Sequence, residues 1–288
     1  MTLLEPGFAL NEYVIRRVVD AGGMCNVYEA STSAEPRSVA VKAMHHVWAQ
    51  DAELRQRFLN EAHLLATLHH THLVESLGNG VLPSGEPFMV LKWLPFSLQN
   101  ILDARKSAIE PQMVYRLSRQ IAQALVFLHE QNIVHRDLKA ANVLLDGDDL
   151  TRANTRLADL GLAKVAPQQR SVLGMQVSTS GQARFGTWDY MAPEQWIRAK
   201  DVGPKADVYS LGVLMFQMLL GELPFVANDA KNLMRMHLFV NAPTERLRGT
   251  CPRPLCTLVD RMLRKTAKER PSMIEVVERL EVVNGKKD

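Results

Sequence analysis

One short run of polar residues and one aspartate downstream have the types and spacing that phosphate chemistry needs. The run is HRDLKAAN at residues 135–142, and Asp159 follows the next predicted strand. Asn142 and Asp159 are separated oxygen donors, which suit Mg²⁺ because this hard cation binds few protein oxygens together with phosphates and water. Asp137 is then a carboxylate that can orient a hydroxyl group and accept its proton. Lys139 can place positive charge where a transferred phosphoryl group develops negative charge.

Features nearer the N-terminus could contact the phosphates, although each has an ordinary explanation when taken alone. Residues 19–27 join two predicted strands, and Gly22 and Gly23 would let backbone amides approach a phosphate closely. A plain hairpin turn explains the same glycines and is favoured on priors. Lys42 ends the predicted strand VAVK, where a lysine is normally just solvated. Glu61 lies on the inward face of a predicted helix and there needs a partner, for which Lys42 is the natural candidate; a helix-flank glutamate in water is the alternative.

Two differently built parts of the chain must hold these residues. Up to about residue 93, short runs rich in valine and tyrosine predict strands with one helix among them. After Pro95, apolar residues recur at helical spacing and predict long helices. The predicted strands are 13–19, 27–30, 39–43, 73–81, 88–91, 143–145 and 156–158, and the predicted helices include 54–68, 114–128 and 207–220. Residues 163–186 have no periodicity, and a loop longer than about 15 residues in a compact domain is usually functional.

The composition is that of an ordinary globular chain and excludes several classes of protein. Of 288 residues, 47% are apolar and 23% are charged, which excludes disorder and fibrous repeats. No apolar stretch reaches the ~20 residues of a membrane-spanning helix, and no secretory signal is evident, so we expect a cytoplasmic chain without a membrane segment. The net charge of +3 is too small to indicate nucleic acid as a partner. Cys25, Cys251 and Cys256 are an odd set without metal-type spacing, which indicates reduced thiols.

The motifs occur in an order that makes the chain resemble the catalytic domain of the eukaryotic-like serine/threonine protein kinases, with details closer to the bacterial members. The resemblance covers about residues 13–280. It implies an α+β, bilobal fold, with a small β-rich N-terminal lobe over 1–93 that contains one key helix and a larger, mainly helical C-terminal lobe over 94–288. It also implies ATP and Mg²⁺ as cofactors, with Mn²⁺ as a substitute, and places ATP in the seam between the lobes.

Carried over onto this chain, the resemblance implies a role for each matching residue of the reaction site. Lys42 would hold the α- and β-phosphates of ATP and pair with Glu61. Asp137 would be the catalytic base with Lys139 beside it, and Asn142 and Asp159 would hold the metal ions. The nucleotide would contact a set of residues on the glycine hairpin, around the adenine and after the last N-terminal strand, namely Val19, Ala21, Gly22, Gly23, Val27, Ala40, Lys42, Leu91, Trp93 and Leu144.

The resemblance also implies structural and regulatory residues. Asp207 would brace the catalytic loop, and Glu194 would form a buried ion pair with Arg270. Lys139 and the Gly186-Thr187 pair favour serine or threonine over tyrosine as the acceptor, while the GGM sequence and Gln195 point to bacterial relatives. Arg136 precedes the catalytic aspartate, as in kinases whose activation loop is phosphorylated, since an arginine there can pair with a phosphate. The candidate acceptors are Thr179, Ser178, Ser180 and Ser171.

Departures from the family pattern keep a second reading open. Asp20 stands where the first loop glycine belongs and Cys25 where the third belongs, so we expect weaker nucleotide binding. Leu160 replaces a phenylalanine and keeps its packing role, and the turn between Asn142 and Asp159 is longer than usual. The leading hypothesis is a kinase that phosphorylates protein hydroxyls and self-associates for trans-autophosphorylation. The alternatives are a pseudokinase scaffold, which only the altered glycine loop supports, and a small-molecule kinase, which the segment at residues 186–194 disfavours.

Overall fold

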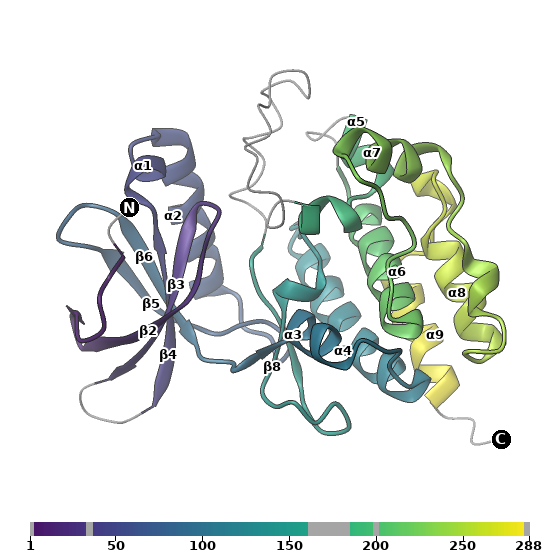
Figure 1. The fold of residues 1–288 in the computed structure, drawn as a ribbon, viewed down its shortest axis with the longest axis horizontal. Coiled ribbons are helices and arrows are strands. Elements are labelled where there is room, and N and C mark those ends of the chain that lie inside the picture. Colours follow the sequence, from purple (N-terminus) through teal and green to yellow (C-terminus); the bar gives the residue numbers. More distant parts are fainter. Residues whose placement is uncertain (1–2, 33–36, 161–184, 198–201, 285–288) are drawn as a thin grey trace. The chain divides into compact units, whose positions relative to one another are not determined.

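The computed structural model describes residues 3–32, 37–160, 185–197 and 202–284, with the side chains of 185–187 and 282–284 left aside. Contacts divide the chain into two compact units (Figure 1). The first contains the described residues up to His69 together with Leu73–Leu94, and the second contains His70–His72 and the described residues from Pro95 onward. The three residues His70–His72 therefore belong to the second unit, although the chain returns to the first unit directly after them.

The first unit is an antiparallel sheet with a long helix. The order of its strands is β1-β2-β3-β4-β6-β5, and each neighbouring pair is antiparallel. The strands are β1 (Ala9–Leu10), β2 (Tyr13–Gly22), β3 (Cys25–Thr32), β4 (Ser38–Met44), β5 (Ser76–Val81) and β6 (Pro87–Lys92). Tyr28, Val41 and Phe88 are buried in its core, because alternate residues of the strands point to one face. This arrangement confirms the expected β-rich N-terminal part.

Two helices follow β4 in this unit, where the sequence predicted one. The short helix α1 (His46–Ala49) precedes α2 (Ala52–Thr67), which begins two residues before the predicted 54–68 and ends one residue before it. The Asp51 side chain caps α2 by accepting the amides of Glu53 and Leu54 at 2.9 and 3.1 Å. The prediction missed α1 because a single four-residue turn is too short to show helical periodicity.

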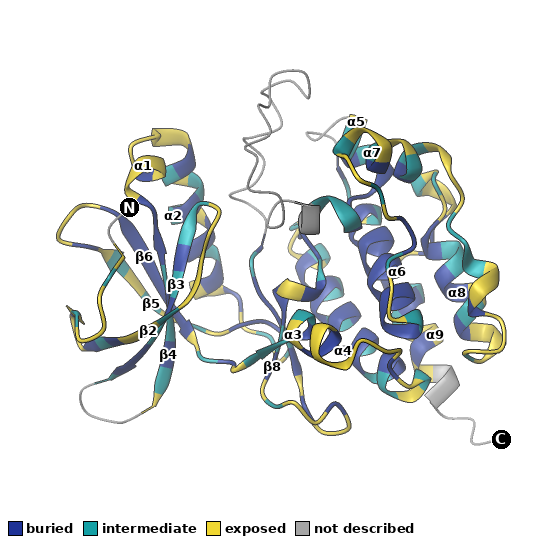
Figure 2. Ribbon diagram, viewed as in Figure 1, coloured by how far each residue is buried: buried dark blue, intermediate teal, exposed yellow. Residues whose placement is uncertain are grey.

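The second unit is mainly helical around a central apolar helix. Residues along α6 (Lys205–Leu220) are buried almost without interruption, so the helix needs no polar face (Figure 2). Around it the helices are α3 (Leu98–Arg105), α4 (Pro111–Glu130), α5 (Pro193–Ile197), α7 (Ala230–Phe239), α8 (Arg253–Met262) and α9 (Met273–Asn284). In the described part of the chain, no helix has the length and apolar character to cross a membrane.

A small sheet in this unit carries the predicted strand pair. Its order is β7 (Phe96–Ser97), β8 (Val143–Leu145), β9 (Thr155–Leu157), with Val143 paired to Leu157. The second strand begins one residue earlier than predicted and ends before Ala158, because Thr155 pairs with Leu145 and closes the ladder. The two-residue β7 was not predicted. Most of the aperiodic segment predicted over 163–186 lies outside the described residues.

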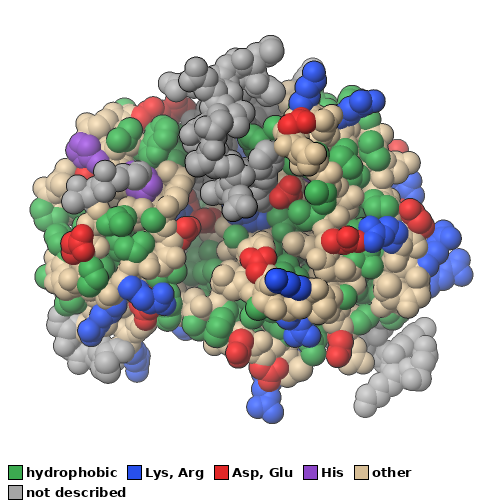
Figure 3. Space-filling view, viewed as in Figure 1, with side chains coloured by type: hydrophobic (Ala, Val, Ile, Leu, Met, Phe, Trp, Pro, Cys, Tyr) green, Lys and Arg blue, Asp and Glu red, His purple; other side chains and the backbone are tan. Residues whose placement is uncertain are grey.

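Charged side chains of both signs are interspersed on the face shown in Figure 3. This distribution agrees with the net charge of +3, since 34 basic residues are nearly balanced by 31 acidic ones.

Candidate active site

Lys42 and Glu61 meet in the first unit. Lys42 lies on β4, whose neighbours β3 and β6 pair with it through Val27 and Met89. Its Nζ lies 3.5 Å from Glu61 Oε1, and the Glu61 side chain is only 2% exposed. Glu61 shares the buried face of α2 with Phe58 and Leu65, so helical spacing alone turns it toward the sheet. A buried carboxylate needs such a partner, and the structure supplies the one that the sequence suggested.

The glycine segment is a hairpin between β2 and β3. Gly22 pairs with Cys25, and Gly23 lies in the turn with φ +62°, a conformation that favours glycine. Asp20 pairs with Val27 in the same ladder, so it is a strand residue close to the turn. Val19 is 42% exposed, which is high for a valine and shows that the hairpin does not use it in the core.

The remaining predicted nucleotide residues of the first unit lie on one face of the sheet. Ala40 and Lys42 alternate with the buried Val41, so they point to the opposite face, where Val27 pairs with Lys42 and Leu91 pairs with Ala40. Further along, the guanidinium of Arg17 lies 5.9 Å from the ring centroid of Trp93. Leu144, the predicted adenine contact of the second unit, lies on β8 and is half-buried.

Asp207 holds the backbone of the catalytic loop. Its carboxylate accepts the amides of His135 and Arg136, each at 2.9 Å, and lies 2.8 Å from His129 Nε2. The Asp207 side chain is fully buried. Arg136 has φ +64°, a left-handed conformation that few non-glycine residues adopt without support. The two accepted amides belong to Arg136 and to the residue before it, so Asp207 stabilises the kink that precedes Asp137.

Asp137 is fixed by bonds from within its own loop. Asn142 Nδ2 donates to the Asp137 backbone oxygen and to Asp137 Oδ2, both at 2.8 Å. Lys139 Nζ lies 3.4 Å from the same Oδ2. Neither bond uses the amide oxygen of Asn142, the atom type that Mg²⁺ prefers. The loop therefore gathers a carboxylate, an ammonium group and an amide oxygen at one point.

Asp159 lies beside this loop because of the β8–β9 ladder. The Ala158 amide donates to the Asn142 backbone oxygen at 2.9 Å, so the residue before Asp159 is bonded to Asn142 itself. Asp159 has φ +58°, a second strained position in the same region. The extra residues between Asn142 and Asp159 form a turn that satisfies its own polar groups, for example through the Asn154 amide bonded to Asp146 Oδ1 at 2.7 Å.

An ion pair and a glutamine connect the α5 segment to the rest of the second unit. Arg270 donates to both carboxylate oxygens of Glu194, at 2.7 and 2.9 Å, and its side chain is 0% exposed. Gln195 Nε2 donates to the Arg136 backbone oxygen at 2.9 Å, while its oxygen accepts the Ala192 amide. Gln195 thus bonds the α5 segment directly to the loop that carries Asp137.

The remaining predicted residues lie partly or wholly outside the described residues. Thr187 lies in the 3-10 helix Phe185–Tyr190, but its side chain is not among those that the structure describes. The phosphorylation candidates Ser171, Ser178, Thr179 and Ser180 lie outside the described residues. Arg136 donates through Nη2 to the Val202 oxygen at 3.2 Å, and its buried Nε has no hydrogen-bond partner among the described residues.

Sequence reasoning missed two residues that support the site and one buried histidine elsewhere in the second unit. His129 contacts Asp207 across 78 positions, and Gln120 accepts the Thr155 amide at 2.8 Å, which holds the start of β9 on α4. His237 is buried among Tyr209, Phe225 and Trp196, and burial lowers its pKa to about 3. Each of these residues interrupts an otherwise apolar helix face, and this interruption was the only feature of the sequence that could have indicated them.

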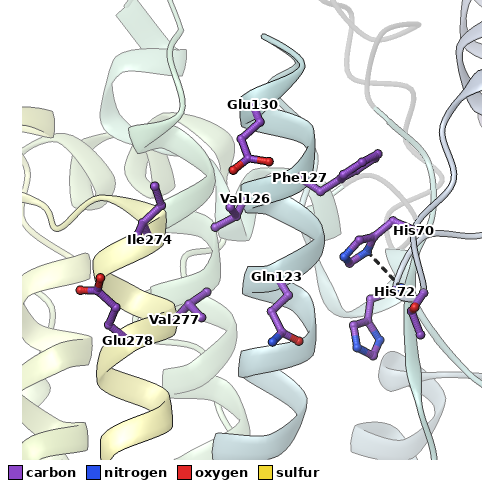
Figure 4. Close-up of a pocket in the computed structure, with 10 residues that line it drawn as sticks. His70, His72, Gln123, Val126, Phe127, Glu130, Ile274, Val277 and Glu278 are labelled. Carbon is purple, nitrogen blue, oxygen red and sulfur yellow. Dashed lines mark hydrogen bonds between the residues drawn. The ribbon is translucent and has the colours of Figure 1, made fainter.

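One open groove of about 520 Å³ lies elsewhere in the second unit (Figure 4). Its walls are α4, α9 and the segment His70–His72, with Phe127 stacked on His70 at a ring-centroid distance of 5.1 Å. None of the predicted site residues lines it. Within the described residues, no cluster of three or more His, Cys, Asp and Glu side chains could hold a metal ion.

Comparison with known proteins identifies the family. The family model described as "Protein kinase domain" matches residues 13–280. The chain belongs to the protein kinase family. It is 29% identical over 275 residues to the serine/threonine-protein kinase PrkC of Bacillus subtilis, which covers 93% of this chain and 39% of that protein. It is 34% identical over 263 residues to the serine/threonine-protein kinase pkn2 of Myxococcus xanthus, covering 89% of this chain and 30% of that protein.

A solved structure supports the fold of this kinase chain. The PknI kinase domain of Mycobacterium tuberculosis matches with a TM-score of 0.70 and 22% identity, covering 99% of this chain and all of that one. The likeness confirms the expected α+β kinase-like fold, with a β-rich N-terminal part and a helical C-terminal part. The kinase chain spans less than half the length of the curated relatives named above.

Proposed function

We propose that the chain is a serine/threonine protein kinase that transfers the γ-phosphoryl group of ATP to a protein hydroxyl. The observation that carries the proposal is the arrangement around Asp137, whose Oδ2 accepts from Asn142 at 2.8 Å and lies 3.4 Å from Lys139 Nζ. That arrangement orients a base and places positive charge beside it, which phosphoryl transfer requires. The names of the relatives, all serine/threonine protein kinases, agree with this acceptor class.

The residues present fit a nucleotide and a hard divalent cation. Asn142 and Asp159 offer an amide oxygen and a carboxylate, which together suit Mg²⁺, or Mn²⁺ in its place, as long as phosphates and water complete the shell. When bound, the cation would neutralise charge on the phosphates. Lys42, held in place by Glu61, would bind the α- and β-phosphates as a point charge. Positioning and charge neutralisation then supply most of the catalysis.

In the proposed reaction, Asp137 orients the substrate hydroxyl and accepts its proton as the oxygen attacks the γ-phosphorus. Lys139 stabilises the charge that develops on the transferred group. Because ATP is an intracellular substrate, we place the reaction in the cytoplasm. The acceptor is a protein serine or threonine, since Lys139 and Thr187 match the pattern of kinases with that specificity.

Activation by phosphorylation in trans is part of the same proposal. Arg136 is half-buried and its Nε has no partner among the described residues, so a phosphate could satisfy it with a charge-assisted bond. Thr179 is the favoured acceptor, ahead of Ser171, Ser178 and Ser180. Protein purified with a phosphatase and then incubated with Mg-ATP should gain phosphate in residues 163–187, measured by mass spectrometry, and a lack of gain would remove this part of the proposal.

Transfer of labelled phosphate from ATP to a generic protein substrate tests the function. Asp137→Asn should lower the rate by about 10²- to 10⁴-fold, since that is the range of a general base. Asp148→Asn is the matched control, because Asp148 is exposed in the β8–β9 turn. If the wild type and Asp137→Asn both show only background activity, and nucleotide still raises the melting temperature, the pseudokinase is favoured instead. If both proteins show high activity, Asp137 is not the base.

A further inference from the structure

The second unit holds a pair of thiols that the proposed phosphoryl transfer does not use. Cys251 Sγ and Cys256 Sγ lie 2.8 Å apart, and neither sulfur is in a disulfide. A disulfide bond measures about 2.05 Å, so the sulfurs need to approach by only ~0.8 Å to bond. A movement of that size lies within the reach of small side-chain rotations.

The backbone between the two cysteines is held so that the sulfurs converge. Pro252 directly precedes α8 and Pro254 lies in its first turn, and a proline ring fixes φ. Both thiols also point at a single acceptor, the backbone oxygen of Leu247, with sulfur–oxygen distances of 3.7 Å for Cys251 and 3.3 Å for Cys256. Leu247 is completely buried, so this acceptor is fixed in the packed unit.

Both cysteines are partly exposed, which gives a small oxidant access to them. Burial of the site and the neighbouring Cys256 thiol raise the pKa of Cys251, so Cys251 stays protonated near neutral pH. Cys256 lies in the first turn of α8, with its Sγ also 3.4 Å from the Cys251 backbone oxygen. Because the N-terminal end of a helix favours negative charge, we take Cys256 as the sulfur that reacts first.

We propose that Cys251 and Cys256 form an oxidative modification site that closes to a reversible intramolecular disulfide with hydrogen peroxide. Cys256 releases its proton and, as the thiolate, attacks one peroxide oxygen; the O–O bond breaks, and the leaving hydroxide takes up the released proton, which gives a sulfenic acid and one water. The Cys251 sulfur then attacks the sulfenic sulfur, hydroxide leaves with the thiol proton as a second water, and the S–S bond forms. Two thiols are oxidised by two electrons in total, and one peroxide is reduced to two waters.

The sequence around the pair gives a direct readout. Trypsin cleaves after Arg248 and Arg261 but resists the Arg253–Pro254 bond, so both cysteines fall in one peptide, residues 249–261. Native protein is treated with stoichiometric hydrogen peroxide, blocked with iodoacetamide and digested without reductant. We expect this peptide to appear unalkylated and about 2 Da lighter than its dithiol form, and to recover two alkylatable thiols after dithiothreitol.

Variants separate this pairing from other oxidation. Cys25→Ser, which removes the remaining cysteine of the chain, should give the same lighter peptide. Cys251→Ser should give no lighter peptide and should instead leave Cys256 as a sulfenic or sulfinic acid, with folding checked by circular dichroism. Two alkylated cysteines in the wild-type peptide after peroxide would overturn the proposal. A disulfide to Cys25, or a dimer on a non-reducing gel, would also overturn it.

Discussion

The substitution Asp207→Asn tests whether the carboxylate of Asp207 holds the catalytic loop. In the folded chain this carboxylate accepts two backbone amides at 2.9 Å and lies 2.8 Å from His129 Nε2. An asparagine has the same size, but its NH₂ group cannot accept, so one amide of His135 or Arg136 loses its partner. A buried donor without a partner costs ~1–3 kcal/mol, and the remaining bonds lose the assistance of the negative charge.

Summed over these contacts, the loss of folding free energy is about 2–4 kcal/mol. In a chain of this size that lowers the melting temperature by roughly 5–10 °C. The phosphoryl-transfer rate should also fall by about tenfold to a hundredfold, because small displacements of a positioned group are expensive in rate and Asp137 follows the kinked Arg136 directly. Asp207→Ala should destabilise the fold more, since it leaves both amides unpaired.

The assay is thermal unfolding followed by steady-state kinetics at saturating ATP, with Asp148→Asn as the matched exposed control. A melting temperature of Asp207→Asn within about 1 °C of wild type would refute the reasoning, since the hydrogen bonds of the Asp207 carboxylate would then contribute nothing to the free energy of unfolding. A fall in rate without any loss of stability would assign Asp207 to the chemistry instead.

Other predictions concern packing, pH and the glycine hairpin. Gly212→Ala should lower the free energy of unfolding by about 1–3 kcal/mol in denaturant titrations, because a Cβ there would lie 2.9 Å from Met262 Cβ, a clash that outweighs the gain in helix propensity. His237 has a pKa of about 3 in the folded chain, against an ordinary value of 6.5. Between these two pH values the unfolded chain binds a proton on His237 that the folded chain does not, so the free energy of unfolding falls as the pH drops from 6.5 toward 3. Unfolding titrations from about pH 7 to about pH 5 should show this fall at up to ~1.4 kcal/mol per pH unit, and His237→Gln should flatten it. Asp20→Gly should lower the Michaelis constant for ATP about threefold by removing a negative charge beside the phosphates, and an unchanged or higher value would count against that repulsion.

Much of the fold could be predicted from the sequence because its local patterns agree with its tertiary structure. The helix with Glu61 could be predicted from spacing, since burial on an amphipathic helix repeats every three to four residues. The helix α6 could be predicted from its nearly unbroken run of apolar residues. The short α1 and β7 could not be seen, because elements of four and two residues carry too little periodicity. Their formation depends on contacts made by the rest of the unit.

The contacts of the candidate site could also be predicted only in part. Lys42 and Glu61 are 19 positions apart, and a buried charge on a helix implies some partner, so the pair could be anticipated. The contact of His129 with Asp207 could not, because no local pattern specifies a partner 78 residues away. The bond from Gln195 to the Arg136 backbone could not be predicted either, although the sequence singled out Gln195 as a residue that points to bacterial relatives.

The long turn between β8 and β9 is an attachment point for engineering. Arg116 binds the oxygens of Leu150 and Arg152 at 2.8 and 2.7 Å, and Asn154 binds Asp146, so both stems of the turn are anchored independently of its tip. A peptide epitope or a fluorescent reporter inserted between Gly147 and Asp148 would therefore extend from the tip without changing the ladder that aligns Asn142 with Asp159. The extra length of this turn thus offers a position at which the enzyme can be immobilised or labelled while its catalytic residues keep their geometry.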